Sequence, residues 1–192
     1  MVTLNRIYTR SGDKGRTRLA TGEPVPKYDA RVAAYGTVDE ANATVGLARL
    51  QCGADPWLDQ TLARIQNELF DLGADLATPE RDGPLAWEPL RVTAPQVERL
   101  ERDIDEMNAR QEPLTSFVLP AGTPLAAALH LARTVTRRAE REAVRLADLE
   151  GETVSPEAIR YLNRLSDLLF VAARRANDDG RADVRGRPGA TR

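Results

Sequence analysis

The sequence predicts an all-α protein, a bundle of five helices of the up-and-down type with a glycine-rich loop before the first helix. Apolar residues recur at spacings of three and four along five stretches of the 192-residue chain. A hydroxyl residue next to a proline marks the start of several of these stretches. No window shows the sustained alternation of β-branched residues that indicates a strand. With 42% apolar residues, the chain is long enough for one domain with its own core.

The first two helices are expected at about residues 29–50 and along a leucine-rich stripe that follows. The first has helical spacing at Val32, Tyr35, Val38, Ala41, Val45 and Ala48. The segment Gly53-Ala-Asp-Pro56 ends it. The second carries Leu58, Leu62, Ile65, Leu69, Leu72 and Leu76. A proline- and glycine-rich stretch, TPERDGPLAWEPLRV, then predicts a long connection.

Three further helices are expected after this connection. The third follows the capping-box pattern Thr93–Gln96, and its apolar positions are Val97, Leu100, Ile104 and Met107. The fourth begins at Thr123-Pro124 and carries Leu125, Leu129, Ala132, Thr136, Ala139, Ala143 and Leu146. The fifth begins at Ser155-Pro156 and carries Ile159, Leu162, Leu165, Leu169, Ala172 and Ala176. This predicts a loop over residues 1–28, a bundle over 29–177 that forms one domain with the loop, and a flexible polar tail over 178–192.

Composition excludes several classes of function. The 27 cations and 29 anions leave a net charge of -2, so the whole molecule has no bulk attraction for nucleic acid or anionic membrane. Any anion site must be local. One cysteine, no signal-peptide order and no apolar run of roughly 20 residues predict a cytoplasmic protein. With one histidine, His130, the chain lacks the ligands for a zinc or di-iron site, and a hydrolytic triad is disfavoured.

The opening stretch YTRSGDKGRTRLATGE raises the first functional question. It holds Gly12, Gly15 and Gly22 together with four cations, and it has almost nothing apolar to bury. Glycine lets a backbone approach a ligand closely, and hydroxyl and amide groups suit a polyanion. The Walker A pattern is absent. Composition alone leaves two hypotheses open, a phosphate-binding loop and a flexible arm.

Two helical segments carry further candidates. In the fourth helix Arg133, Arg137, Arg141 and Arg145 recur every four residues, and Arg133 and Glu140 lie near the edge of the apolar stripe. A solvated face of ion pairs and an anion site both fit this pattern. In the fifth helix Asn163 and Asp167 lie one turn apart beside Arg160 and Arg164. This cluster fits either a nucleotide contact or a structural polar network.

Five motifs together resemble one known family. They are YTRSGDKGRT, AYGTVDEANATVG, FVLPAGTP, LHLARTVTRRAER and YLNRLSDLLF. Their order and spacing, from about Ile7 to about Asn177, are similar to those of the PduO-type ATP:cob(I)alamin adenosyltransferases. The resemblance implies a homotrimer of five-helix bundles with active sites between subunits. It implies transfer of the 5′-deoxyadenosyl group of ATP to cob(I)alamin, which forms adenosylcobalamin and releases triphosphate.

The resemblance also implies roles for individual residues. In the loop the ATP-binding residues are Thr9, Arg10, Ser11, Gly12, Asp13, Lys14, Gly15, Thr17 and Lys27. In the helices they are Arg137, Arg138, Glu140, Arg141 and Asn163, with Glu140 near the Mg²⁺ of ATP. The implied catalytic residues are Arg137, Asn163, Arg133 and Asp39, the last two pairing across the interface. Phe117 resembles the aromatic residue beneath the corrin ring.

This chemistry accounts for the shortage of histidine and cysteine. Cob(I)alamin is itself a strong nucleophile, so the protein has only to position it in line with C5′ and to neutralise the leaving triphosphate. An apolar wall at Phe117 would remove the lower axial ligand and water from the cobalt. The alternative role of Phe117 is simple packing in the core. The implied partners are a flavin-dependent reductase and an adenosylcobalamin-dependent mutase, with neither nucleic acid nor membrane.

The sequence departs from the family pattern at four positions. Arg10, Arg18 and Ala121 replace the residues usual there, and Gly186 stands where the family often has a tail aromatic. The departures at Ala121 and Gly186 bear on the turn after Phe117 and on closure of the corrin pocket. Two other functions therefore stay open. One is a protein that binds ATP and adenosylcobalamin and delivers the product with little free turnover, and the other is a helical phosphotransferase.

Overall fold

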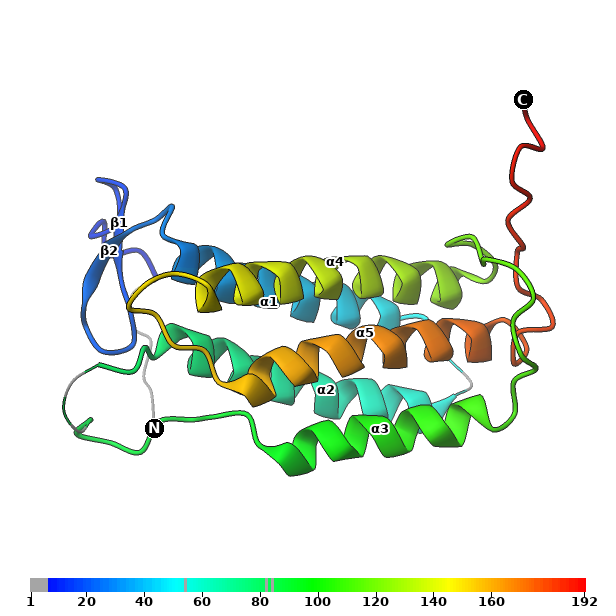
Figure 1. Cartoon of the computed structure of the whole chain (residues 1–192), viewed down its shortest axis with the longest axis horizontal. Coiled ribbons are helices and arrows are strands. Elements are labelled where there is room, and N and C mark those ends of the chain that lie inside the picture. The colour runs from blue at the N-terminus through cyan, green and yellow to red at the C-terminus, as the bar shows by residue number, and fades with distance from the viewer. Residues whose placement is uncertain (1–6, 54, 82, 84) are drawn as a thin grey trace.

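Five helices form the molecule, as the periodicity predicts. They are α1 (Ala30–Arg49), α2 (Pro56–Ala77), α3 (Ala94–Asn108), α4 (Pro124–Ala147) and α5 (Pro156–Ala176). This computed structural model describes residues 7–53, 55–81, 83 and 85–192. Residues 1–6, 54, 82 and 84, which fall in the predicted loop segment, the first predicted break and the long connection, lie outside the described residues. The helices run side by side along one long axis (Figure 1). The predicted five-helix, mainly α class is confirmed.

The N-terminal loop contains a small hairpin that the sequence did not predict. Strands β1 (Arg16–Arg18) and β2 (Pro24–Pro26) pair antiparallel, with Thr17 opposite Val25. Strands of three residues are too short to show the alternation that identifies a strand. Two prolines in β2 also argue against strand on sequence grounds, because proline cannot donate to a ladder. The expectation that the chain has no strand was therefore wrong at this point.

Most helix starts lie where the capping residues predicted them. At the predicted start of α4, Thr123 Oγ1 accepts a hydrogen bond from the Ala126 N–H at 3.1 Å. At α2, for which only a break before the helix was expected, the Asp55 side chain accepts one from the Leu58 N–H at 3.1 Å. At α3 the Gln96 side chain accepts the N–H of Thr93 at 2.8 Å, as a capping box requires. Each cap satisfies backbone donors that have no partner inside the helix.

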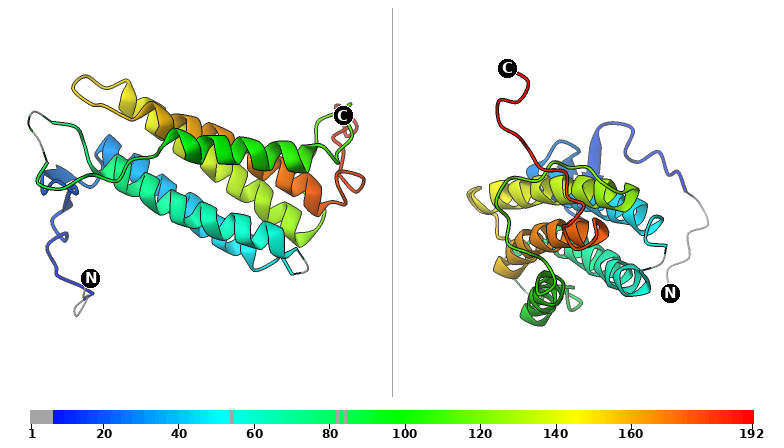
Figure 2. Two further views of the ribbon diagram at one scale, coloured as in Figure 1. Left: turned by 90° about the horizontal axis from the view of Figure 1, so that it is seen from below. Right: turned by 90° about the vertical axis from the view of Figure 1, so that its right-hand side faces the viewer.

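The core lies between α1, α2, α4 and α5, with α3 packed on the outside of α5. Helix α4 packs against both α1 and α5, and α1 packs against α2 (Figure 2). Helices α1 and α4 bury alanine, a small side chain that permits close approach: Ala34, Ala41, Ala48, Ala132, Ala139 and Ala143 are 0% exposed. The predicted apolar stripe of α2, from Leu58 to Leu76, is buried throughout. Each such leucine contributes about 1.5–3 kcal/mol.

The segment after α5 folds back on the bundle. Residues 178–192 were expected to form a flexible polar tail, but residues 183–186 lie against the loop between α3 and α4. The N–H of Leu119 donates to the carbonyl of Val184 at 2.8 Å, and the N–H of Gly186 donates to the carbonyl of Phe117 at 2.8 Å. Among the described helices, none is long and apolar enough to cross a membrane.

We expect the α4 packing to tolerate no larger side chain. Ala143→Leu inserts extra methylene groups at a position that is 0% exposed, which should lower the free energy of unfolding by about 1–3 kcal/mol. Ala127→Leu, at an exposed position of the same helix, is the matched control. Urea unfolding at one protein concentration measures both. Equal stability of the two variants would contradict the assigned packing.

Candidate active site

The N-terminal loop and its hairpin form a cationic cradle, meaning the cavity of about 680 Å³ lined by Ser11, Gly12, Arg16, Thr17, Arg18, Pro24 and Lys27. Three of these side chains are cations and none is a carboxylate. The loop is closed by tight turns, in which Gly15 has a φ of 74° and the N–H of Lys27 donates to the Gly15 carbonyl at 2.9 Å. A Cβ at Gly12 would lie 3.0 Å from Lys27 Nζ, so glycine leaves room for the lysine to cross the loop.

The structure gathers some of the predicted loop residues and not others. Ser11, Gly12, Thr17 and Lys27 line the cradle, and Thr9 adjoins it through a 2.7 Å hydrogen bond between its hydroxyl and that of Ser11. The remaining predicted residues, Arg10, Asp13, Lys14 and Gly15, are exposed outside the lining. Arg16 and Arg18, for which the sequence predicted no binding role, also line the cradle. Both occupy alternate positions of β1, so their side chains lie on the same side of the strand. This relation could be recognised only once the hairpin was known.

A charged network fixes the cradle to the bundle. Arg81 contacts Glu23 of the hairpin at 3.3 Å and Glu152 of the α4–α5 loop at 3.0 Å. Glu152 also pairs with Arg31 of α1, whose side chain is 2% exposed and donates to the Leu76 carbonyl at 2.7 Å. Burial opposes the charged form of Glu152, but hydrogen bonds from Arg81 and Arg31 outweigh it and hold the pKa of this carboxyl below its usual value.

The arginine series of α4 forms one wall of a groove, which we call the arginine groove. Its volume is about 560 Å³, and it is lined by Arg137, Glu140, Arg141, Val144, Arg145, Asp148 and Leu149. Arg141 donates to the carbonyl of Arg137 at 3.2 Å. Arg138, also predicted to bind ATP, points elsewhere and pairs with Glu40 of α1. Three of the four arginines of the series, Arg137, Arg141 and Arg145, therefore line one exposed strip. The fourth, Arg133, lines a different cavity.

A hydrogen-bond chain joins Glu140 to α5. The Asn163 amide donates to Glu140 Oε1 at 2.9 Å, and Asn163 Oδ1 accepts from Arg164 at 2.6 Å. Both ends of the Asn163 amide are thus used, which fixes its orientation and that of the carboxylate it contacts. Asp167 lies one turn after Asn163 on α5. Burial and the charge of Glu140 raise the pKa of Asp167, and the charges of Arg164 and Arg137 only partly oppose this effect. The structure therefore brings the predicted Glu140 and Asn163 together.

Phe117 lies beside a third hollow, the aromatic cavity, of about 550 Å³. Its lining is Leu114, Thr115, Ser116, Phe117, Val118, Arg133 and Phe170. Phe117 is 88% exposed, so its ring is held out of the core. Arg133 Nε and Ser116 Oγ are buried without a hydrogen-bond partner in the described part of the chain. Burial and the nearby charge of Arg137 lower the pKa of Arg133. Polar groups in this state suit a ligand that supplies the missing partners.

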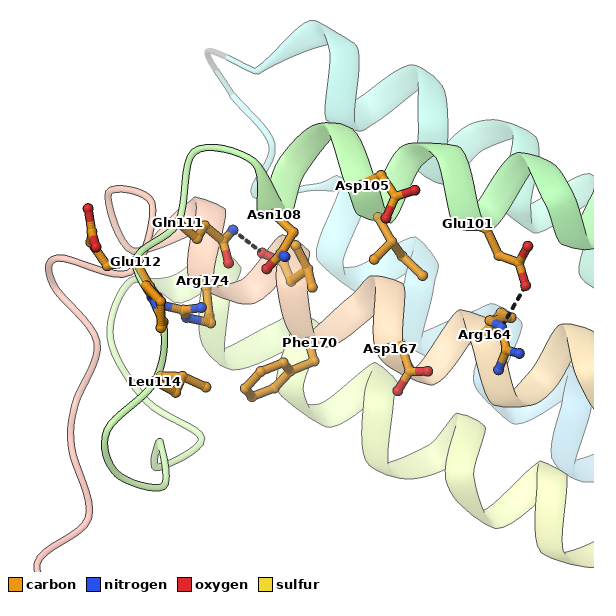
Figure 3. A pocket seen from close by; sticks show the side chains of 13 residues that line it. Glu101, Asp105, Asn108, Gln111, Glu112, Leu114, Arg164, Asp167, Phe170 and Arg174 are labelled. Atoms are coloured by element: carbon orange, nitrogen blue, oxygen red, sulfur yellow. Dashed lines mark hydrogen bonds and ion pairs between the residues drawn. The ribbon is translucent and has the colours of Figure 1, made fainter.

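The aromatic cavity continues into a larger groove between α3 and α5, of about 760 Å³ (Figure 3). The two share Leu114 and Phe170. Asp105 and Asn108 of α3 face Asp167 and Phe170 of α5 across this groove. Neither Phe170 nor this groove was predicted from the sequence. The sequence signal for Phe170 was an aromatic residue next to Leu169 of the apolar stripe. The part of the groove formed by α3 could not be predicted, because it depends on how α3 packs against α5.

Asp39 lies on a different side of the bundle. It lines a cavity of about 300 Å³ between α1 and α2, with Tyr35, Val38, Asn42, Leu69, Phe70, Gly73, Ala74 and Ala77. Arg133, its predicted partner, belongs to the α4–α5 side. Neither residue has an ion pair within the part of the chain that the structure describes. Over those same residues, no group of three histidine, cysteine or acidic side chains is arranged to hold a metal ion.

The fold and the site thus define a helical bundle that carries a cationic cradle, an arginine groove and an aromatic cavity. The family described as cobalamin adenosyltransferase matches residues 7–176. The chain belongs to this family. The corrinoid adenosyltransferase of Mycobacterium tuberculosis is 51% identical over 191 residues, which cover 100% of this chain and 97% of that protein. The corrinoid adenosyltransferase of Bacillus subtilis is 42% identical over 90% of this chain and 86% of its own length.

Solved structures of relatives are similar to this chain in both fold and sequence. A PduO-type ATP:corrinoid adenosyltransferase from Lactobacillus reuteri, a phenylalanine-to-alanine variant complexed with cobalamin and ATP, superposes with a TM-score of 0.86. It is 42% identical, and the match covers 95% of this chain and 99% of that one. An arginine-to-lysine variant of the Lactobacillus reuteri enzyme, complexed with ATP, has a TM-score of 0.83. The resemblance found in the sequence is confirmed.

The anchoring network gives a prediction about stability. Glu152→Gln removes the charge that Arg31 and Arg81 share, and the free energy of unfolding at pH 7 should fall by about 1.5–3 kcal/mol. Because the folded-state pKa of Glu152 is depressed, its contribution is present above the usual value of 4.5 and is lost as the pH falls through the folded-state pKa.

Denaturant titrations of wild type and variant from pH 7 to pH 3 check this expectation. The difference between them should be constant at neutral pH and shrink below pH 4.5. Glu98→Gln, whose side chain is 61% exposed on α3, serves as the control and should show little difference at any pH. A difference for Glu152→Gln that does not vary with pH would contradict the network.

Proposed function

We propose that the protein transfers the 5′-deoxyadenosyl group of ATP to cob(I)alamin and releases triphosphate. The observation that carries the proposal is the combination, in one chain, of two cationic sites for a triphosphate and one aromatic cavity for a flat ring. The relatives named as corrinoid adenosyltransferases, and the solved relative complexed with cobalamin and ATP, support the same reaction. In the reaction Co(I) supplies the electron pair of the new cobalt–carbon bond. The C5′–oxygen bond breaks, and its electron pair leaves with the triphosphate.

The protein accelerates this step by holding the leaving group. Triphosphate departs with several negative charges, so preorganised cations at its position lower the barrier. Lys27, Arg16 and Arg18 in the cradle, and Arg137 and Arg141 in the groove, are such cations. Tight turns and the Arg81 network keep the cradle in place before ATP arrives. In-line geometry then follows from fixing both ends of the nucleotide.

Phe117 and its cavity serve the corrinoid. An aromatic ring that is 88% exposed in one subunit presents apolar surface to a large ligand. Placed against the lower face of the corrin, the ring would displace the lower axial ligand and keep water off the cobalt, which eases reduction to Co(I). Arg133 Nε and Ser116 Oγ, which lack partners in the described residues, would meet the polar amide groups at the corrin edge.

Magnesium fits the arginine groove as the ion of MgATP. Mg²⁺ in nucleotide sites is usually held by one or two carboxylates together with substrate phosphates. Glu140 is such a carboxylate, oriented by Asn163 and flanked by Arg137 and Arg141. Bound there, the ion would neutralise charge on the triphosphate. Glu140 would hold it, and Asn163 would keep that carboxylate from turning away.

The complete site requires two subunits. The cradle is hydrogen-bonded to the end of α2, where the Ala20 N–H donates to the Ala77 carbonyl at 3.0 Å, and Asp39 also lies on the α1–α2 side. Arg133 and the arginine groove lie on α4. Because the two half-sites occupy different faces, a site shared between copies of the chain needs a head-to-tail contact, and such contacts form a ring when the rotation between subunits closes. A homotrimer with Asp39 paired to Arg133 of the next subunit is the ring we propose.

The reaction is tested with reduced cobalamin and MgATP under anaerobic conditions, by following the cob(I)alamin absorbance and the phosphate products. We expect adenosylcobalamin and intact triphosphate. Arg137→Ala should lower kcat/KM by about a hundredfold, since it removes one charge that stabilises the leaving group. Arg102→Ala, at an exposed position of α3, is the control. Release of ADP or phosphate would instead indicate a phosphotransferase, and one turnover without further product would indicate a delivery protein.

The ring is tested by combining two variants of low activity. Lys27→Glu damages the cradle, and Arg137→Ala damages the arginine groove. If each site takes its cradle from one subunit and its arginine groove from the next, mixed oligomers contain sites with both halves intact. Random mixing of equal amounts should restore about a quarter of wild-type activity. The two proteins are unfolded together, refolded and assayed beside each variant alone; activity no higher than the mean of the two would contradict a shared site.

A further inference from the structure

The loop that carries Phe117 is held at its C-terminal end by one buried amide. Asn177, directly after α5, is 0% exposed. Its Oδ1 accepts the N–H of Thr123 at 3.0 Å, and its Nδ2 donates to the Ala121 carbonyl at 3.1 Å. Nδ2 also donates to Asp183 Oδ1 at 3.3 Å. Asn177 therefore connects the turn before α4 to the segment after α5.

The N-terminal end of the same loop is held by an ion pair. Arg174 Nε donates to Asp183 Oδ2 at 2.9 Å, and the two side chains are only 7% and 2% exposed. Arg174 Nη2 donates to the carbonyl of Glu112 at 2.9 Å, and Arg174 lies beside Glu112 and Leu114 in Figure 3. One carboxylate, Asp183, thus binds the side chains that hold both ends of the Phe117 loop. We call Arg174, Asn177 and Asp183 the latch.

Two glycines show how closely the latch is packed. A Cβ at Gly122 would lie 2.2 Å from Asn177 Oδ1, and a Cβ at Gly180 would lie 2.5 Å from Arg174 Nη2. Both glycines also have positive φ, 112° and 89°, which other residues rarely adopt. A side chain at either position would have to displace Asn177 or Arg174, so both glycines are needed for the observed packing of the latch.

The backbone of Phe117 is held directly by the tail. Its carbonyl accepts the N–H of Gly186 at 2.8 Å, the next residue forms a bridge with Arg185, and Leu119 donates to Val184. The ring of Phe117 is nevertheless 88% exposed. A rigid backbone with an exposed ring is what a preformed ligand wall requires, because ordering has occurred before the ligand binds.

We propose that Arg174, Asn177 and Asp183 are positioning residues for Phe117, an inference that rests on the proposed function. None of the three lines the aromatic cavity, and only Arg174 lines the adjoining groove between α3 and α5. Their effect on Phe117 is therefore exerted through the loop and the tail. A buried ion pair is weak support for stability, since its desolvation offsets its attraction, but it does select one geometry. The latch fixes the wall that removes the lower axial ligand from cobalt, and it should not affect the ATP side of the reaction.

Asp183→Asn tests this role, because it keeps the shape of the side chain and removes the charge that binds Arg174. With MgATP present, the electron paramagnetic resonance spectrum of added cob(II)alamin reports the lower axial ligand. We expect the fraction without that ligand to fall by about threefold, and the KM for cobalamin to rise by about tenfold. The KM for ATP should change by less than about twofold. A merely structural role would change both KM values together.

Asp178→Asn is the matched control. It removes an ion pair with Arg181 in the same segment, but those side chains are 64% and 65% exposed. Its cob(II)alamin spectrum and KM values should equal those of wild type. Gly122→Ala, which displaces Asn177 without removing the ion pair, should reproduce the effect of Asp183→Asn. An unchanged axial-ligand fraction in both latch variants would overturn the proposal.

A measurement on the wild-type protein covers the case in which the variants fail to fold. Hydrogen exchange of the Leu119 and Gly186 amides should be slower than that of the amides of residues 190–192 by at least about a hundredfold. Fast exchange at Leu119 and Gly186 would overturn the latch, whatever the variants do. If wild type exchanges slowly but makes no adenosylcobalamin, the proposed function fails. If it makes adenosylcobalamin and the variants match it, only the positioning role fails.

Discussion

The burial of one side of α4 is the constraint on which the rest of the structure depends. Ala132, Thr136, Ala139 and Ala143 are fully buried between α1 and α5. Because side chains follow one another at about 100° around a helix, this burial fixes the rotation of α4 and leaves Arg137 and Arg141 on the adjoining exposed strip. The core and the anion site are therefore two sides of one helix, and any change in packing that rotates α4 also moves its guanidinium groups.

That arrangement concentrates like charge on one strip. Arg133 has a pKa lowered by burial and by the charge of Arg137, and within the described residues its Nε has no hydrogen-bond partner. A guanidinium group in this state is unfavourable until a carboxylate or a phosphate is near. In the proposed function the strip is complemented from outside, by the triphosphate and by the α1–α2 side of another subunit. The same electrostatic imbalance would then account for both substrate binding and association.

Much of this organisation could be predicted from local sequence. The helices followed from apolar spacing, and the Thr93–Gln96 box, Thr123 and Ser155 marked the starts of three of them. The arginine column followed from its four-residue repeat. Features formed by distant segments could not be predicted in this way. Arg16 and Arg18 needed the β1–β2 pairing, which three-residue strands do not reveal.

The latch shows the same limit more sharply. Asn177 and Thr123 are 54 residues apart in the chain, so no local pattern connects them. The residues after 177 are polar and glycine-rich, and such composition usually indicates a flexible tail. Burial of Asp183 reverses that interpretation. A polar segment becomes ordered when its charges find buried partners, and those partners are visible only in three dimensions.

The cradle and the Phe117 loop, which we propose face the two substrates, share one principle of construction. At the base of the cradle lies the buried Arg31 with Glu152, and at the base of the Phe117 loop lies Arg174 with Asp183. Arg31, Arg174 and Asp183 are nearly inaccessible to water and Glu152 is partly buried, whereas Lys27 and Phe117, which we propose meet the substrates, are exposed. Pairs in a low-dielectric setting are sensitive to geometry, so each base allows little movement. A protein that need not supply a nucleophile must supply position, and both loops derive their position from a buried arginine that binds a carboxylate.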